Sequence, residues 1–286
     1  MSVAALSRMV KFEHSLFALP FAASTLALVA PEARLDLRRL SLVALAVVAA
    51  RTAAMAMNRI ADRRFDAGNP RTRSRELVTG AVSLPTAWTL LAASAGAFVL
   101  AAFAISTLCG ALAAPVLGVL LGYSYAKRFT WAAHLWLGVA QALGPIGVAV
   151  ALTGRAPASA VLLGLGVGAW VAGFDVLYSL QDMEFDRGAR LHSIPARFGV
   201  AGALAWSRLL HLAAAAAIVG AGLLAGRGPG WLAGSVLLAA VLGSEHVYVA
   251  PGGRLRGDRI GAAFFTFNAF ASVAFAACAL ADLARF

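Results

Sequence analysis

The stretch PASAVLLGLGVGAWVAGFDVLYSLQDMEFD, residues 157–186, joins a long apolar run to an acidic end. The run at about 157–180 is long enough to cross the hydrocarbon core of a bilayer as one helix. Asp182 and Asp186 follow it at a spacing of four, which places two carboxylates on the same face of a helix. The stretch therefore predicts a membrane-spanning helix that ends in a pair of acids.

Similar apolar runs occupy most of the chain. Of its 286 residues, 61% are hydrophobic and 13% are charged, which is more apolar surface than a soluble core of this size can bury. We expect an all-α polytopic membrane protein with nine spans, at about 12–30, 40–58, 84–106, 108–126, 132–153, 157–180, 200–225, 230–250 and 260–283. No polar domain or low-complexity linker interrupts them, so residues 1–286 are predicted to form a single integral membrane domain.

The first thirty residues share some features with a secretory signal peptide, because basic Arg8 and Lys11 precede an apolar stretch. Glu13 and His14 interrupt that stretch, and the rest of the chain is itself membranous. We therefore interpret these residues as a retained first span.

The net charge of +11 is arranged along the chain as expected for a membrane protein, not for a nucleic-acid-binding protein. With nine spans and a cytoplasmic N-terminus, sixteen Lys and Arg residues fall on the cytoplasmic side and six on the other. This is the positive-inside bias, which sets membrane orientation. It predicts that both acidic regions of the chain open towards the cytoplasm.

Two acidic blocks have matched spacing: Asn58-x3-Asp62-x3-Asp66 and, 120 residues later, Tyr178-x3-Asp182-x3-Asp186. Helical spacing makes each block one polar stripe, and the second stripe extends back to Asp175. Because charged groups are costly in lipid, the stripes are expected to face a cavity or each other. Converging carboxylates need a cation, and Mg²⁺ is commonly shared between carboxylates and phosphate. The blocks therefore predict a magnesium-dependent site for a diphosphate.

A simpler alternative is that these acids only pair with neighbouring arginines at the membrane edge, where ion pairs contribute little. Glu184 lies about 200° from Asp182 on a helix, so we expect it to be solvated or salt-bridged. The GLGVG segment at 164–168 is interpreted as a helix-packing surface, since no strand precedes it as in a nucleotide loop. Gly118-x3-Gly122 is expected to favour close helix packing in the same way.

Three segments resemble the UbiA superfamily of intramembrane aromatic prenyltransferases. They are NRIADRRFDAGNPRTRSRELVTGAVS at 58–83, FDVLYSLQDMEFDRGARLHSIPARFG at 174–199 and the short basic YSYAKRFTW at 123–131. The chain looks like the bacterial quinone-pathway branch, which includes 4-hydroxybenzoate polyprenyltransferases and enzymes of futalosine-dependent menaquinone synthesis. KFEHSLFALPF at 11–21 and LHSIPARFG at 191–199 favour the latter group.

The resemblance implies a nine-helix bundle around a central cavity, with a cytoplasmic cap, in the bacterial inner membrane. It assigns two Mg²⁺ ions to Asn58, Asp62, Asp66, Asp182 and Asp186, with the four aspartates as the catalytic set. Arg71 and Lys127 would contact the diphosphate, and Arg128 would bind the aromatic carboxylate, whose geometry guanidinium matches. Tyr178 and Arg51 complete the expected substrate-binding set, with Arg51 equally open to a role as structural counterion.

The implied reaction moves a polyprenyl group from its diphosphate to a small aromatic acid in ubiquinone or menaquinone synthesis. The acceptor would be of the 4-hydroxybenzoate or 1,4-dihydroxy-6-naphthoate type. The second block lacks the lysine that some family members carry ahead of its first acid, which leaves one basic contact in doubt. Three alternatives stay open: another acceptor, a CDP-alcohol phosphotransferase, and a transporter with intramembrane acids. Membrane lipid is the expected surrounding partner, and no nucleic acid is expected.

Overall fold

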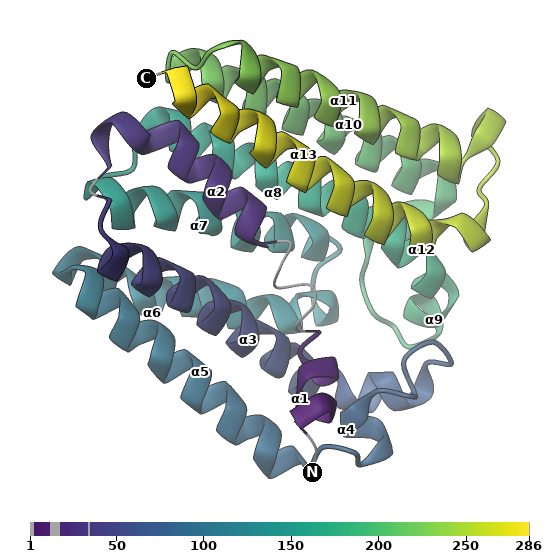
Figure 1. Ribbon diagram of the computed structural model, residues 1–286. Helices are drawn as coiled ribbons and strands as arrows, with labels where there is room; N and C mark the ends of the chain where they lie inside the picture. The colour runs from purple at the N-terminus through teal and green to yellow at the C-terminus, as the bar shows by residue number, and fades with distance from the viewer. Residues whose placement is uncertain (1–2, 12–17, 34, 286) are drawn as a thin grey trace. The chain divides into compact units, whose positions relative to one another are not determined.

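The computed structural model describes residues 3–11, 18–33 and 35–285, and within these ranges it contains helices and turns but no strand (Figure 1). It divides into two compact units. Unit 1 is Met1–Leu19 with Leu35–Ala126, and unit 2 is Pro20–Arg34 with Lys127–Phe286. The two acidic blocks fall in different units, the first in unit 1 and the second in unit 2.

Unit 1 is organised around one long helix. Its helices are α1 (Val3–Met9), α3 (Leu37–Gly68), α4 (Glu76–Thr79), α5 (Leu84–Ile105) and α6 (Thr107–Gly122), and the 3₁₀ segment Tyr123–Arg128 leads into unit 2. Asp36 caps α3 by accepting a hydrogen bond from the backbone N–H of Arg39 at 2.8 Å, which satisfies a donor at the helix start. Ala53 and Ala56 of α3 pack with Leu91 of α5 in a buried cluster. Small residues therefore bring α3 close to α5.

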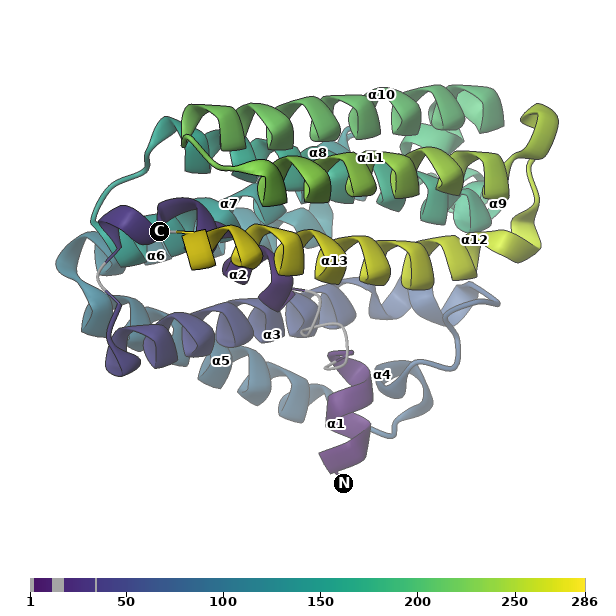
Figure 2. The same cartoon turned by 45° about the horizontal axis from the view of Figure 1, so that its top comes forward.

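Unit 2 contains the remaining helices. They are α2 (Ala18–Val29), α7 (Ala133–Thr153), α8 (Ala158–Ser179), α9 (Met183–Gly188), α10 (Ile194–Leu224), α11 (Pro229–Val249), α12 (Ile260–Ala262) and α13 (Asn268–Ala281). In Figure 2, α10, α11 and α13 run side by side, and α8 packs extensively against α7 and α10. The buried Trp170 of α8 donates its indole N–H to Asn268 Oδ1 of α13 at 2.6 Å. Unit 2 thus has its own core, in which this buried hydrogen bond joins α8 to α13.

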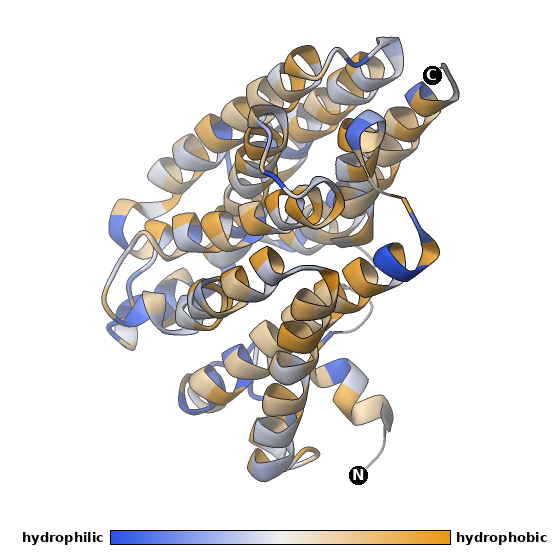
Figure 3. Ribbon diagram, turned by 90° about the vertical axis from the view of Figure 1, so that its left-hand side faces the viewer, coloured by the Kyte–Doolittle hydropathy of each residue, from blue (hydrophilic) through white to orange (hydrophobic). Residues whose placement is uncertain are grey.

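Eight helical segments of the described residues are long and apolar enough to cross a membrane, and they match the second to ninth predicted spans. Figure 3 shows hydrophobic residues along the long helices and hydrophilic ones gathered towards helix ends and connections. The first predicted span, 12–30, is described only from residue 18, where the 12-residue α2 is too short for the same criterion. Residues 12–17 of that prediction lie outside the described ranges. The all-helical membrane architecture is confirmed, with eight such spans in the described part of the chain.

Two long spans depart from regular α-helix near their predicted cytoplasmic ends. After α8, residues Leu180–Asp182 form a 3₁₀ turn before α9 begins. The predicted second stripe is therefore not one continuous α-helix, because a 3₁₀ turn winds more tightly than the 3.6-residue period assumes. In α10 the helix is broken at Gly199, whose φ of 67° and ψ of −172° only glycine adopts readily. This break explains why α10 begins several residues before its predicted start at 200.

The GLGVG segment of α8 is a close helix-packing surface, as predicted. A Cβ added to Gly164 would lie 2.6 Å from the carbonyl oxygen of Ala142, and one added to Gly168 would collide with the backbone of Gly138. A Cβ on Gly166 would lie 2.8 Å from Ile218 of α10. The corresponding expectation for Gly118 is wrong within the described structure, since a Cβ there meets nothing within 4 Å.

Replacing Gly168 by Ala is expected to destabilise the packing of α7 on α8. The new methyl group would meet backbone atoms, which cannot rotate away, and overpacking of this kind typically costs about 1–3 kcal/mol. Thermal unfolding followed by fluorescence-detected size exclusion should show a melting temperature lowered by several degrees. Gly118→Ala is the matched control and should melt like the parent chain, whereas equal melting of the two variants would contradict this packing.

Candidate active site

The first acidic block lies on α3 with its three side chains at successive turns, as the spacing predicts. The Asn58 amide donates a hydrogen bond from Nδ2 to Asp62 Oδ2 at 2.9 Å, so these two side chains contact each other directly. Asp66, one turn further on, is buried. The block therefore presents two carboxylates and one amide oxygen on one side of the helix.

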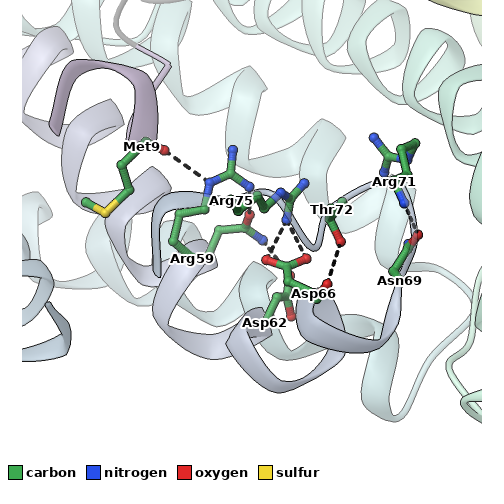
Figure 4. A network of polar contacts seen from close by, with 9 residues as sticks. Met9, Arg59, Asp62, Asp66, Asn69, Arg71, Thr72 and Arg75 are labelled. Atoms are coloured by element: carbon green, nitrogen blue, oxygen red, sulfur yellow. Dashed lines mark hydrogen bonds and ion pairs between the residues drawn. The ribbon is translucent and has the colours of Figure 1, made fainter. Parts of the chain in front are cut away.

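Asp66 is held by an arginine that the sequence analysis did not select. Arg75 Nη1 lies 2.6 Å from Oδ1 and 2.7 Å from Oδ2 of Asp66 (Figure 4). The intervening loop folds back on the same residue, because the Thr72 hydroxyl donates to the backbone carbonyl of Asp66 at 3.2 Å. Arg71, the predicted diphosphate contact, lies in the same loop and donates its backbone N–H to Asn69 Oδ1 at 2.9 Å.

Two further arginines of α3 bind the end of α1. Arg59 is buried and donates from Nε to the carbonyl of Met9 at 3.1 Å. Arg51 donates from Nη1 to the carbonyls of Val10 and Lys11, both at 3.4 Å. Cations are favourable at a helix C-terminus, where backbone carbonyls have no helical partner. These contacts connect α3 to the end of α1, and the substrate-binding and counterion roles of Arg51 both stay predictions.

Lys11, at the end of α1, lies in a cation-rich environment. Burial lowers the pKa of its ammonium group below the usual value, and the charges of Arg59, Arg75 and Arg71 lower it further, with Glu76 opposing them. Three of the four charged groups that act on Lys11 are therefore arginines, and one is an acid. Unit 1 thus combines its acidic block with a group of cations suited to an anionic ligand.

The second acidic block lies in unit 2, where α8 passes through the 3₁₀ turn into α9. Asp182 closes that turn and Asp186 lies in α9, and both are buried. Glu184 behaves as predicted: its side chain is 79% exposed and pairs with Arg187 at 3.1 Å. Asp182 and Asp186, which the spacing indicated, are thus buried, whereas the neighbouring Glu184 lies at the surface.

Lys127 is the cation of the second block. Its Nζ lies 3.2 Å from Asp186 Oδ2, and Asp175 and Asp182 are also within electrostatic reach of its charge. Its backbone carbonyl accepts the N–H of His192 at 2.7 Å, which ties the segment before α7 to the loop after α9. Each block therefore pairs its last aspartate with a basic residue from a different segment, Arg75 in unit 1 and Lys127 in unit 2.

The other two predicted substrate-binding residues of this region have different surroundings. Arg128 is exposed. Tyr178 packs edge-on against Phe265, with ring centroids 6.3 Å apart, and partly covers the hydrophobic core of unit 2. Tyr178 therefore packs against the core beside the acids, and its substrate contact stays a prediction.

The donor atoms of both blocks suit a hard divalent cation. They are carboxylate and amide oxygens, the ligands that Mg²⁺ prefers. Among the described residues of either unit, however, no group of three or more His, Cys, Asp and Glu side chains is gathered at metal-binding spacing. The two aspartates of each block therefore fall short of such a group by themselves.

Comparisons with known proteins agree with these features. Residues 17–270 match the UbiA prenyltransferase family. The chain is 36% identical over 208 residues to the 4-hydroxybenzoate octaprenyltransferase of Aromatoleum aromaticum, covering 71% of this chain and 68% of that one. It is 34% identical over 190 residues to the enzyme of the same name from Pseudomonas aeruginosa, covering 63% and 62%.

Solved structures show the same fold. A UbiA homolog from Aeropyrum pernix K1, in its apo form, has a TM-score of 0.84 at 36% identity, covering 95% of this chain and 98% of that one. A UbiA homolog from Archaeoglobus fulgidus bound to GPP and Mg²⁺ has a TM-score of 0.71 at 19% identity, covering 98% and 99%. The second likeness concerns the fold alone.

Proposed function

Because the chain belongs to the UbiA prenyltransferase family, and is thus an integral membrane prenyltransferase, we propose that it transfers a polyprenyl group to 4-hydroxybenzoate. The observation that carries this proposal is the pair of acidic blocks, each with a buried aspartate beside a cation. The acceptor rests on the names of relatives 33–37% identical to this chain. The prenyl donor would be a polyprenyl diphosphate.

The proposed metal ligands are the oxygen-bearing residues of the two acidic motifs. Two Mg²⁺ ions would be held by the oxygen ligands of the two blocks, Asn58, Asp62 and Asp66 with Asp182 and Asp186. Lys127 and Arg71 would contact the diphosphate, and to these we add Arg75 and Lys11. Support comes from the oxygen-only donor set and from the cations around Lys11.

The chemistry follows from the charge that develops on the leaving group. Magnesium, when bound, acts as a Lewis acid on the diphosphate oxygens. Arg75 and Lys127 orient Asp66 and Asp186, while Lys11 and its neighbouring arginines would stabilise the negative charge that grows as the allylic C–O bond breaks. The allylic cation is then attacked by the ring carbon beside the phenol oxygen. No side chain forms a covalent intermediate in this scheme.

Orientation and location are also part of the proposal. The acidic blocks would lie at the cytoplasmic face of a bacterial inner membrane, which the excess of basic residues on one side of the predicted spans supports. This arrangement would let the aromatic acid enter from the cytoplasm and the prenyl chain from the lipid.

An assay with radiolabelled polyprenyl diphosphate tests the function. The purified chain in lipid nanodiscs should label 4-hydroxybenzoate in the presence of Mg²⁺ and not after chelation. A parallel reaction with 1,4-dihydroxy-6-naphthoate tests the menaquinone-pathway alternative, which two sequence segments favour. Label in neither acceptor would contradict the proposed aromatic transfer.

Lys11 predicts a pH dependence of prenyl diphosphate binding. The anion binds the charged lysine, so affinity should be greatest below the lowered pKa of Lys11 and should fall as the pH rises through it. This decline begins at a lower pH than an ordinary lysine would give. Binding titrations from neutral to alkaline pH should show this decline in affinity. Lys11→Met should bind the prenyl diphosphate more weakly at neutral pH, and its affinity should not show the same decline. An unchanged profile in Lys11→Met would remove Lys11 from the site.

Arg128 is proposed to recognise the acceptor carboxylate. Arg128→Ala should raise the KM for 4-hydroxybenzoate at least about tenfold, the loss expected for a charge-assisted pair, and change the KM for the prenyl donor little. Arg254→Ala, another exposed arginine, is the control and should resemble the parent enzyme. Equal effects of Arg128→Ala on both substrates would contradict the assignment.

A further inference from the structure

A histidine and an aspartate form a short contact beside the second acidic block, and the function above uses neither. His134 lies in the first turn of α7 and Asp175 in the last turns of α8. His134 Nδ1 is 2.6 Å from Asp175 Oδ2, across 41 residues of sequence. The contact therefore joins two helices that also meet at their glycines.

The two members of the pair differ in access. His134 is completely buried, whereas the Asp175 side chain is 19% exposed. The second ring nitrogen of His134, Nε2, lies 3.4 Å from the hydroxyl of Ser179, which can donate to it when Nδ1 carries the ring proton. The imidazole is thus fixed on both sides, and the carboxylate is the member that a substrate can reach.

Asp175 also belongs to the electrostatic environment of the second block. Its charge acts on Lys127, as do the charges of Asp182 and Asp186. It precedes Asp182 by seven residues, which is about 10 Å along a helix. In the proposed site, a prenyl diphosphate bound at Asp182 and Asp186 would have its reacting carbon beyond the phosphates. Asp175 lies in that direction along the helix, where the acceptor ring would stand.

We propose that Asp175 accepts the ring proton that aromatic alkylation must release, and that His134 is its positioning residue. This inference rests on the proposed function. The ring π electrons form the new carbon–carbon bond to the allylic carbon. The C–H electron pair then returns to the ring and restores aromaticity, while the proton passes to the accessible carboxylate oxygen of Asp175. The carboxylic acid formed afterwards gives this proton to water.

His134 contributes by holding Asp175 through an N–H···O contact to one carboxylate oxygen. A general base must lie at hydrogen-bonding distance from the proton it removes, and its alignment contributes as much as its basicity. A fully buried imidazole with both nitrogens engaged has little freedom to turn, so it keeps the second oxygen in one direction.

The test combines Asp175→Asn with a ring-deuterated acceptor. In the parent enzyme, slow ionisation of the prenyl diphosphate should mask proton removal and leave the isotope effect on kcat near 1. Asp175→Asn should lower product formation roughly 10²-fold or more, the usual contribution of a general base. The isotope effect on kcat of Asp175→Asn should rise clearly above 1. More diphosphate should be released than prenylated acid formed, because water reacts with the allylic cation when proton removal from the ring is slow.

Two further variants separate catalysis from folding. Asp175→Glu restores a carboxylate and should recover part of the lost activity, and His134→Gln should lower kcat less than Asp175→Asn with little change in either KM. Both should bind the prenyl diphosphate like the parent enzyme. Loss in Asp175→Asn without an isotope effect, with diphosphate release and product reduced together, would overturn the proposal, as would full activity of that variant.

The outcomes also distinguish this inference from the proposed function. If the parent enzyme labels no aromatic acid, the function itself is wrong. If the parent labels the acid and Asp175→Asn does so equally well, only the role of Asp175 is wrong.

Discussion

Asp62→Asn and Asp182→Asn are each expected to lower prenyl transfer by at least about 10³-fold, equivalent to about 4 kcal/mol of transition-state stabilisation. Asparagine keeps the size of the side chain and removes the negative charge that a magnesium ion requires. Asp62 already contacts Asn58, and an amide at residue 62 can keep that hydrogen bond. Both variants should therefore remain folded in the membrane. The measurement is kcat/KM with the labelled prenyl donor at saturating magnesium.

Glu184→Gln is the matched control for Asp182→Asn. Glu184 is an acid two residues away in sequence, but it is exposed and pairs with Arg187. Its replacement should leave transfer within about twofold of the parent, because exposed ion pairs contribute little. Magnesium-dependent activity that survives in Asp62→Asn and Asp182→Asn would exclude both residues from the site.

Lys127→Met is expected to have the second-largest effect, a loss of about 10²-fold or more in kcat/KM. The substitution removes the cation that pairs with the buried Asp186 and, in the proposed site, a contact to the diphosphate. An unpaired buried carboxylate is costly and tends to take up a proton, which would make it a poor metal ligand. The apparent magnesium requirement should therefore rise along with the loss of rate.

Lys127→Arg is the control, since it keeps the positive charge. It should retain more activity than Lys127→Met, although its planar guanidinium does not reproduce the point charge of an ammonium group. If Lys127→Met keeps the parental magnesium requirement, the pairing with Asp186 is structural and the residue has no part in metal binding.

Most of the fold could be predicted because apolar length and helical spacing are local properties. Eight of the nine predicted spans match long apolar helices of the described residues. The first acidic block lies on one helix as predicted, whereas the second is divided between a 3₁₀ turn and α9. Glu184 is exposed and pairs with Arg187, as its position indicates. The glycines at 164–168 pack closely because small residues in an apolar helix are typical of contact surfaces.

The missed features depend on contacts that spacing does not encode. Arg75 reaches Asp66 across a loop, at a separation of nine residues that matches no helical period. Lys11 comes from the turn after α1, far from Asp66 in sequence, and the His134–Asp175 contact joins residues of α7 and α8 that no local motif connects. The 3₁₀ turn at Leu180–Asp182 contains no glycine or proline, so the sequence does not predict it. Only the folded arrangement within each unit reveals these partners.

Binding of an unreactive prenyl thiolodiphosphate with magnesium, measured by calorimetry, tests the central claim that both acidic blocks hold one diphosphate. The parent chain, Asp62→Asn, Asp182→Asn and the double variant form a complete double-mutant cycle. A shared site predicts that each single change loses most of the affinity and that the double change adds little to either. Parental affinity in one single variant, or losses that simply add in the double variant, would contradict a shared site.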